Sequence, residues 1–171
     1  MGMSIFNESE NRPVDLPPDN HELDAVRSRI KRGANWFFWI AGLSLINSIV
    51  LLAGGSLNFI IGLGMTQVIY AVCHVISHQS GGANAFTVIV LLLDVLVAGV
   101  FAAFGFFAGK GYVAAFIIGI VLYVLDALLY LLLGDILAAA FHGLALFYMV
   151  RGVMAAFELK AATKSAPMMQ T

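Results

Sequence analysis

Charged residues are scarce in this sequence: only 11% of its 171 residues are Asp, Glu, Lys or Arg, whereas 61% are hydrophobic. A soluble domain carries about 25% charged residues, so the composition indicates a membrane protein. The formal net charge is −1, and the few basic residues flank apolar runs, which leaves no basic face for nucleic acid. The single cysteine, Cys73, excludes an intramolecular disulfide.

Sequence signatures of catalysis are also missing. There is no HExxH zinc motif, and Gly62 and Gly64 lack the strand and the full glycine pattern of a nucleotide-binding loop. Ser44, Ser48 and Ser56 have no base beside them in the sequence, and no serine hydrolase motif is present. We therefore expect a protein that is not an enzyme.

The N-terminal residues form the most polar stretch, and we expect residues 1–33 to be a cytoplasmic tail. Residues 1–18 are polar and rich in proline, which predicts disorder. A short amphipathic helix over about 20–32 should follow, capped by Asp19 and ended by Gly33. Its basic residues indicate a helix lying on the anionic leaflet or, as we prefer, a solvated helix whose charges set the topology. No cleavable signal peptide is expected, because the first apolar run starts late and is too long.

Four later runs are long and apolar enough to cross a bilayer as helices, which takes about 20 residues. They predict an all-helical membrane domain over 34–158, followed by a flexible tail over 159–171. The predicted spans cover about 35–53, 85–108, 112–133 and 136–157. A fifth run, 57–77, is less apolar and is interpreted as a re-entrant helix, an interfacial helix or a fifth span.

The positions of lysine and arginine favour four spans over five. Five spans would place the basic residues from Lys110 to Lys164 outside the cell, against the tendency of Lys and Arg to stay in the cytoplasm. Four spans place both termini and all basic clusters inside. We therefore predict a multi-pass protein of the inner membrane with a cytoplasmic N-terminus, and five spans remain the alternative.

Isolated polar residues interrupt the predicted spans. Asp94 and Asp126 each stand alone in an apolar run, where an ionisable side chain costs about 2.5–3.5 kcal/mol. Counted at about 1.5 Å per residue, both acids share one layer of the four-span bundle with other polar side chains. That layer also contains Asn47, His142 and, on the helical face of Asp126, Tyr123 and Tyr130.

Two interpretations of this polar layer stay open. In the first, Asp94 or Asp126 binds and releases a proton or cation, and His142 relays it because its pKa lies near neutrality. In the second, the acids are protonated or hydrogen-bonded and hold the helices together.

A metal or haem site is a further alternative. His74 and His78 are four residues apart, so they share one helical face, and His142 is expected at a similar depth. Histidines at this spacing near a membrane surface are usually just interfacial polar residues. We predict no cofactor, and zinc, copper or haem at these three histidines remains the alternative.

Small residues recur at four-residue intervals in two spans, which lets helix backbones approach closely within lipid. These packing positions are Ala98, Ala102, Gly111, Ala115 and Gly119. Because four or five short spans enclose little interior, we expect a homo-oligomer or a subunit of a larger membrane complex. The leading functional hypothesis is a structural or accessory subunit that acts by helix–helix association in the lipid bilayer. A small proton- or cation-coupled carrier or channel comes second, and a metal- or haem-binding protein third.

Overall fold

The computed structural model describes residues 20–52, 64, 68 and 83–165, and within these ranges it is entirely helical. The four helices are α1 (Asn20–Leu52), α3 (Ala83–Gly109), α4 (Val113–Leu132) and α5 (Ile136–Ser165). The predicted disordered segment 1–18 lies outside the described residues, as does the ambiguous 57–77 segment apart from Gly64 and Val68.

Each of the four helices is long and apolar enough to cross a membrane. The qualifying stretches are Asn20–Val50, Val88–Gly109, Val113–Leu132 and Ile136–Lys164. In lipid every backbone polar group must be satisfied internally, and a continuous helix achieves this without outside partners. The prediction of an all-helical protein is therefore confirmed over the described part of the chain, which has four helices long and apolar enough to span a membrane.

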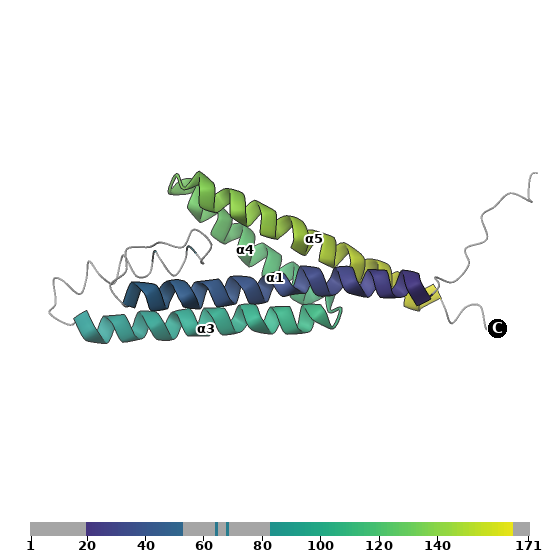
Figure 1. Ribbon diagram of the computed structural model, residues 1–171, viewed down its shortest axis with the longest axis horizontal. Helices are drawn as coiled ribbons and strands as arrows, with labels where there is room; N and C mark the ends of the chain where they lie inside the picture. Colours follow the sequence, from purple (N-terminus) through teal and green to yellow (C-terminus); the bar gives the residue numbers. More distant parts are fainter. Residues whose placement is uncertain (1–19, 53–63, 65–67, 69–82, 166–171) are drawn as a thin grey trace, which may run out of the picture.

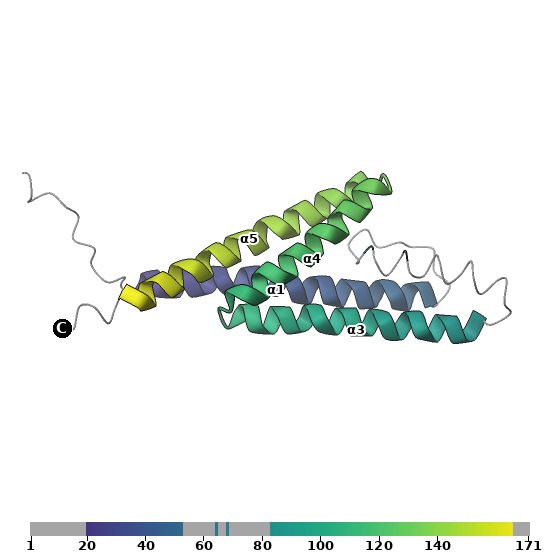
Figure 2. The same cartoon turned by 180° about the vertical axis from the view of Figure 1, so that it is seen from behind.

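The helices form two pairs that meet at one end (Figures 1 and 2). α1 and α3 run side by side, and α4 and α5 form a second hairpin that diverges from them toward the end where α4 gives way to α5. The start of α1 and the end of α5 lie together at the opposite end. Both hairpin turns contain a glycine with positive φ, +87° at Gly111 and +78° at Gly134, a conformation that L side chains rarely adopt.

Helix α1 does not stop at Gly33, contrary to the prediction of a separate helix over 20–32. Gly33 instead faces Gly152 of α5, and a Cβ atom added to Gly33 would stand 2.7 Å from the Gly152 Cα atom. The two backbones therefore touch at a glycine–glycine crossing, and the missing side chain serves close packing rather than helix termination. Helix α5 likewise continues to Ser165, past its predicted end at 157 and into the expected flexible tail.

Aromatic rings fill the junction between the two helix pairs. Phe37 of α1 is fully buried and contacts Phe101 and Phe116, with ring centroids 6.3 and 5.9 Å away. Gly119 lies directly under the Phe37 ring, where no Cβ atom would fit. The outward faces are apolar, as lipid-facing surfaces are, with Leu92 exposed by 64%.

The other predicted packing positions have different environments. Ala98 and Ala115 are buried, and Ala102 is half-buried beside the core. Gly111 lies in the α3–α4 turn, where no atom lies within 4 Å of the place its Cβ would take. The need for glycine at position 111 is thus explained by its backbone conformation and not by helix packing.

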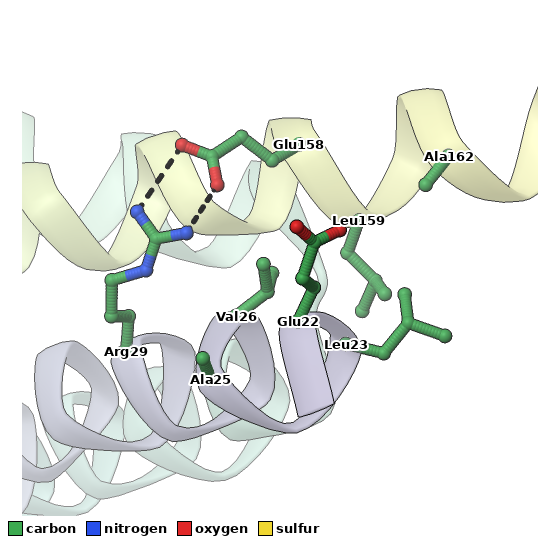
Figure 3. A pocket seen from close by; sticks show the side chains of 8 residues that line it. All are labelled: Glu22, Leu23, Ala25, Val26, Arg29, Glu158, Leu159 and Ala162. Carbon is green, nitrogen blue, oxygen red and sulfur yellow. Dashed lines mark hydrogen bonds and ion pairs between the residues drawn. The ribbon is translucent and has the colours of Figure 1, made fainter. Parts of the chain in front are cut away.

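Every lysine and arginine that the structure describes lies in the first half of α1, in the second half of α5 or in the α3–α4 turn, whose Lys110 lines a pocket with Arg27 and Lys31 of α1. Arg29 of α1 forms a two-pronged ion pair with Glu158 of α5, with Nη1–Oε1 at 3.3 Å and Nη2–Oε2 at 2.5 Å (Figure 3). Both side chains are partly exposed, so the pair is worth at most about 1 kcal/mol. Its role is to set the register of α1 against α5 beyond the glycine crossing.

Candidate functional site

A buried acid–histidine pair joins α4 to α5. Asp126 is 2% exposed and His142 is fully buried, and His142 Nε2 lies 3.0 Å from Asp126 Oδ2. The two residues come from either side of the α4–α5 turn, so the hairpin brings them together. No other ion pair between described residues is as deeply buried.

The second ring nitrogen determines where the histidine carries hydrogen. His142 Nδ1 lies 2.8 Å from the backbone carbonyl oxygen of Ala138. Because a carbonyl only accepts hydrogen bonds, Nδ1 must bear a hydrogen and donate it. A second proton then lies between Nε2 and Asp126 Oδ2. The pair is either imidazolium with carboxylate or neutral imidazole with carboxylic acid, and both arrangements have zero net charge.

This neutrality makes the pair compatible with hydrocarbon, where an isolated charge is costly. Moving the shared proton between Nε2 and Oδ2 leaves the net charge at zero. Adding or removing one proton creates a buried net charge, which burial strongly disfavours. Exchange with solvent therefore requires a change in the surroundings of the pair.

Three further groups surround the pair. The Tyr123 ring stacks on the His142 ring at a centroid distance of 4.5 Å and an angle of 18°, and Tyr130 lies against it at 4.9 Å. The backbone N–H of Gly64 donates to Asp126 Oδ2 at 2.9 Å. A Cβ atom at Gly64 would stand 2.7 Å from Tyr130, so only glycine brings this amide so close to the carboxyl group.

The Tyr123 hydroxyl is the unusual group of the site. It is buried, and within the described part of the chain it has no hydrogen-bond partner. Buried hydroxyls nearly always have a partner, so Tyr123 is a polar group that the described residues leave unsatisfied beside the Asp126–His142 pair. A phenol can donate or accept a hydrogen bond.

Asp94 occupies a separate polar site between α1 and α3. It is fully buried, and its two carboxyl oxygens accept hydrogen bonds from Ser44 Oγ at 2.8 Å and from Ser48 Oγ at 2.5 Å. Asn47 is buried on the same stretch of α1. Both carboxyl oxygens accept from hydroxyl groups, and no described residue forms an ion pair with Asp94, so this arrangement fits a hydrogen-bonded link between the two helices.

The residues of the predicted polar layer are thus divided between two pairs of helices. Asp126, His142, Tyr123 and Tyr130 come together, whereas Asp94 and Asn47 lie on α3 and α1. Sequence reasoning missed Ser44 and Ser48, although their four-residue spacing puts both hydroxyls on one helical face opposite a lone acid. It also missed the Gly64 amide, which carries no side-chain signal.

A metal site finds little support in the described residues, which contain no group of three or more His, Cys, Asp or Glu side chains placed to hold an ion. Both ring nitrogens of His142 already lie within hydrogen-bonding distance of protein oxygens. His74 and His78 lie outside the described residues.

No protein-family model, curated protein or solved structure matches this chain.

Proposed function

We propose that this protein is a small proton-conducting carrier or channel of the inner membrane, with Asp126 and His142 as its proton-binding site. The observation that carries the proposal is the pair itself, two titratable side chains that are buried within an apolar helical hairpin and lie 3.0 Å apart. Intramembrane ionisable residues that pair with one another commonly mark proton relays.

The surroundings of the pair support coupling between proton binding and conformation. Asp126 Oδ2 accepts from Gly64, which belongs to neither helix of the hairpin. The amide of Gly64 thus ties the carboxyl group of Asp126 to a part of the chain outside the hairpin. A displacement of Gly64 relative to α4 would change the hydrogen bonding of Asp126, which links the proton site to the conformation of the protein.

The proposed orientation puts both termini in the cytoplasm. The described lysines and arginines gather at the end that holds the termini, whereas the α4–α5 turn carries Asp135, and in that described turn there is no basic residue. This asymmetry follows the positive-inside rule. Asp126 and His142 are each a few residues from the α4–α5 turn. In this orientation the proton site therefore lies in the half of the bundle nearer the outer surface.

Proton flux into liposomes tests the proposal. The protein is reconstituted into vesicles that contain a pH-sensitive dye, and a potassium diffusion potential is imposed across the membrane. The luminal pH should then change at least about tenfold faster than in protein-free vesicles. Asp126→Asn should abolish this excess, because an amide cannot exchange a proton. The asparagine keeps one of the two hydrogen bonds at this position, either accepting from the Gly64 N–H or donating to His142 Nε2.

Asp94→Asn is the matched control, since it removes the other buried acid, whose partners among the described residues are the hydroxyl groups of Ser44 and Ser48. It should retain most of the flux. Flux in the wild type equal to that of protein-free vesicles, or equal loss in both variants, would count against the proposal.

A structural or accessory subunit remains the second candidate, in a homo-oligomer or a larger membrane complex. Gly42, Gly99 and Gly143 favour it, because no atom of the described residues lies within 4 Å of the positions their Cβ atoms would take. Such open backbone lets a neighbouring helix approach closely. If the protein is such a subunit, Asp126→Asn should leave its function unchanged.

A further inference from the structure

A small basic pocket lies between α1, the end of α5 and the α3–α4 turn. Its volume is about 180 Å³, and its lining includes three cationic side chains, Arg27, Lys31 and Lys110. Ile30 and Leu159 add an apolar surface. None of the described residues that line it is acidic.

The three cations come from segments far apart in the sequence. Arg27 and Lys31 are four residues apart and share one face of α1, and Lys110 is contributed by the turn after α3. Like charges brought together by a fold repel one another unless an anion lies between them. The convergence thus costs free energy in the free protein, which a bound anion would recover.

Neighbouring groups only partly offset these charges. Arg27 forms an exposed ion pair with Asp24 at 3.4 Å, which is weak in water. The Lys110 Nζ atom lies 4.1 Å from the centre of the Phe106 ring, a cation–π contact that positions the ammonium without neutralising it.

The location of the pocket indicates which class of anion it would bind. It lies at the end where the described basic residues gather, next to exposed aromatic side chains at Phe106, Phe107 and Tyr112. Aromatic and basic residues together are typical of the level of lipid headgroups. Below this level, the outward faces of α1 and α3 are apolar and suited to acyl chains.

We propose that this pocket binds the phosphate group of an anionic phospholipid, with Lys31 and Lys110 as its main ligands. Lysine binds phosphate as a point charge, and an apolar rim accommodates the glycerol end of the lipid. The cytoplasmic leaflet is rich in such lipids, and basic pockets between membrane helices recognise their headgroups. The proposal is independent of the proton site.

Lipid selectivity measured with spin-labelled phospholipids tests it. The full chain is reconstituted in phosphatidylcholine, and the association of labelled phosphatidylglycerol is compared with that of labelled phosphatidylcholine by electron paramagnetic resonance. The wild type should prefer phosphatidylglycerol, and Lys31→Gln with Lys110→Gln should reduce the preference by about fivefold for each lysine removed.

The control variant, Arg151→Gln with Lys164→Gln, changes the formal charge equally and alters residues outside the pocket. It should keep most of the preference. Equal loss in the two variants would show a diffuse charge effect and overturn the proposal, as would no loss in either. Lys110→Gln alone provides the same comparison, against Arg151→Gln, if the double variant does not fold.

Inorganic phosphate distinguishes the lipid from the free ion. Added in excess at constant ionic strength, it should leave the bound phosphatidylglycerol in place, because the acyl chains contribute to binding. Displacement of the labelled lipid by phosphate, but not by an equal concentration of chloride, would overturn the lipid assignment.

Discussion

Replacing Asp126 by alanine is expected to lower the free energy of unfolding by about 3–5 kcal/mol, the usual cost of removing one partner of a buried ion pair. The variant removes the oxygen that lies within hydrogen-bonding distance of both His142 Nε2 and the Gly64 N–H. Thermal or denaturant unfolding in mild detergent, followed by circular dichroism, measures the loss.

Two comparisons show whether the loss of stability in Asp126→Ala is specific to the buried pair. Asp24→Ala removes an exposed acid and should change stability by less than about 0.5 kcal/mol. Ordinary hydrogen bonds between membrane helices average about 0.6 kcal/mol. A loss for Asp126→Ala in that smaller range would contradict the description of Asp126 and His142 as a tightly coupled pair.

Substituting Gly33 by alanine should destabilise the fold by about 1–3 kcal/mol, because it overpacks the crossing of α1 and α5. The added Cβ would stand 2.7 Å from Gly152 Cα and 3.0 Å from the Tyr148 carbonyl oxygen. Both neighbours are backbone atoms, so relief requires the helices to move apart.

Gly42→Ala is the matched control on the same helix, since a Cβ there meets nothing within 4 Å. Alanine is the better helix former, so this variant should be neutral or up to about 1 kcal/mol more stable. Melting temperatures of the two variants in the same detergent provide the comparison. Equal melting temperatures would show that α1 and α5 do not cross at Gly33.

The helices were predictable from sequence because lipid leaves the chain few choices. An apolar run of about 20 residues must be helical in a bilayer, so 85–108, 112–133 and 136–157 correspond closely to three of the observed helices. Gly33 was misread because a glycine that ends a helix and one that lets two helices cross look the same in a sequence. Only the facing Gly152 distinguishes them.

The contact between Asp126 and His142 was predictable from counting residues along the helices, whereas the partners of Asp94 were not. Counting residues grouped Asp94, Asp126 and His142 in one layer, and the short turn at Gly134 then made the contact between Asp126 and His142 a local one. The partners of Asp94 lie on α1, 46 and 50 residues away in sequence. Which face of α3 meets α1 depends on packing of the whole bundle, which no local pattern specifies.

Proton flux and proton binding separate the two leading functions. A bundle that holds its helices together through Asp126 and His142 needs the hydrogen bonds of the pair but no exchange of its proton. A carrier or channel needs both the hydrogen bonds of the pair and the exchange of its proton. The exchange itself is therefore the decisive property.

Infrared difference spectroscopy of the reconstituted protein tests proton exchange at Asp126 most directly. On a change between about pH 6 and pH 10, a range in which solvent-exposed carboxyl groups stay ionised, we predict a change in a carboxylic acid band. The change should vanish in Asp126→Asn and persist in Asp94→Asn. A spectrum without a pH-dependent carboxyl band, or one whose band survives in Asp126→Asn, would contradict the assignment of Asp126 and His142 as the proton site.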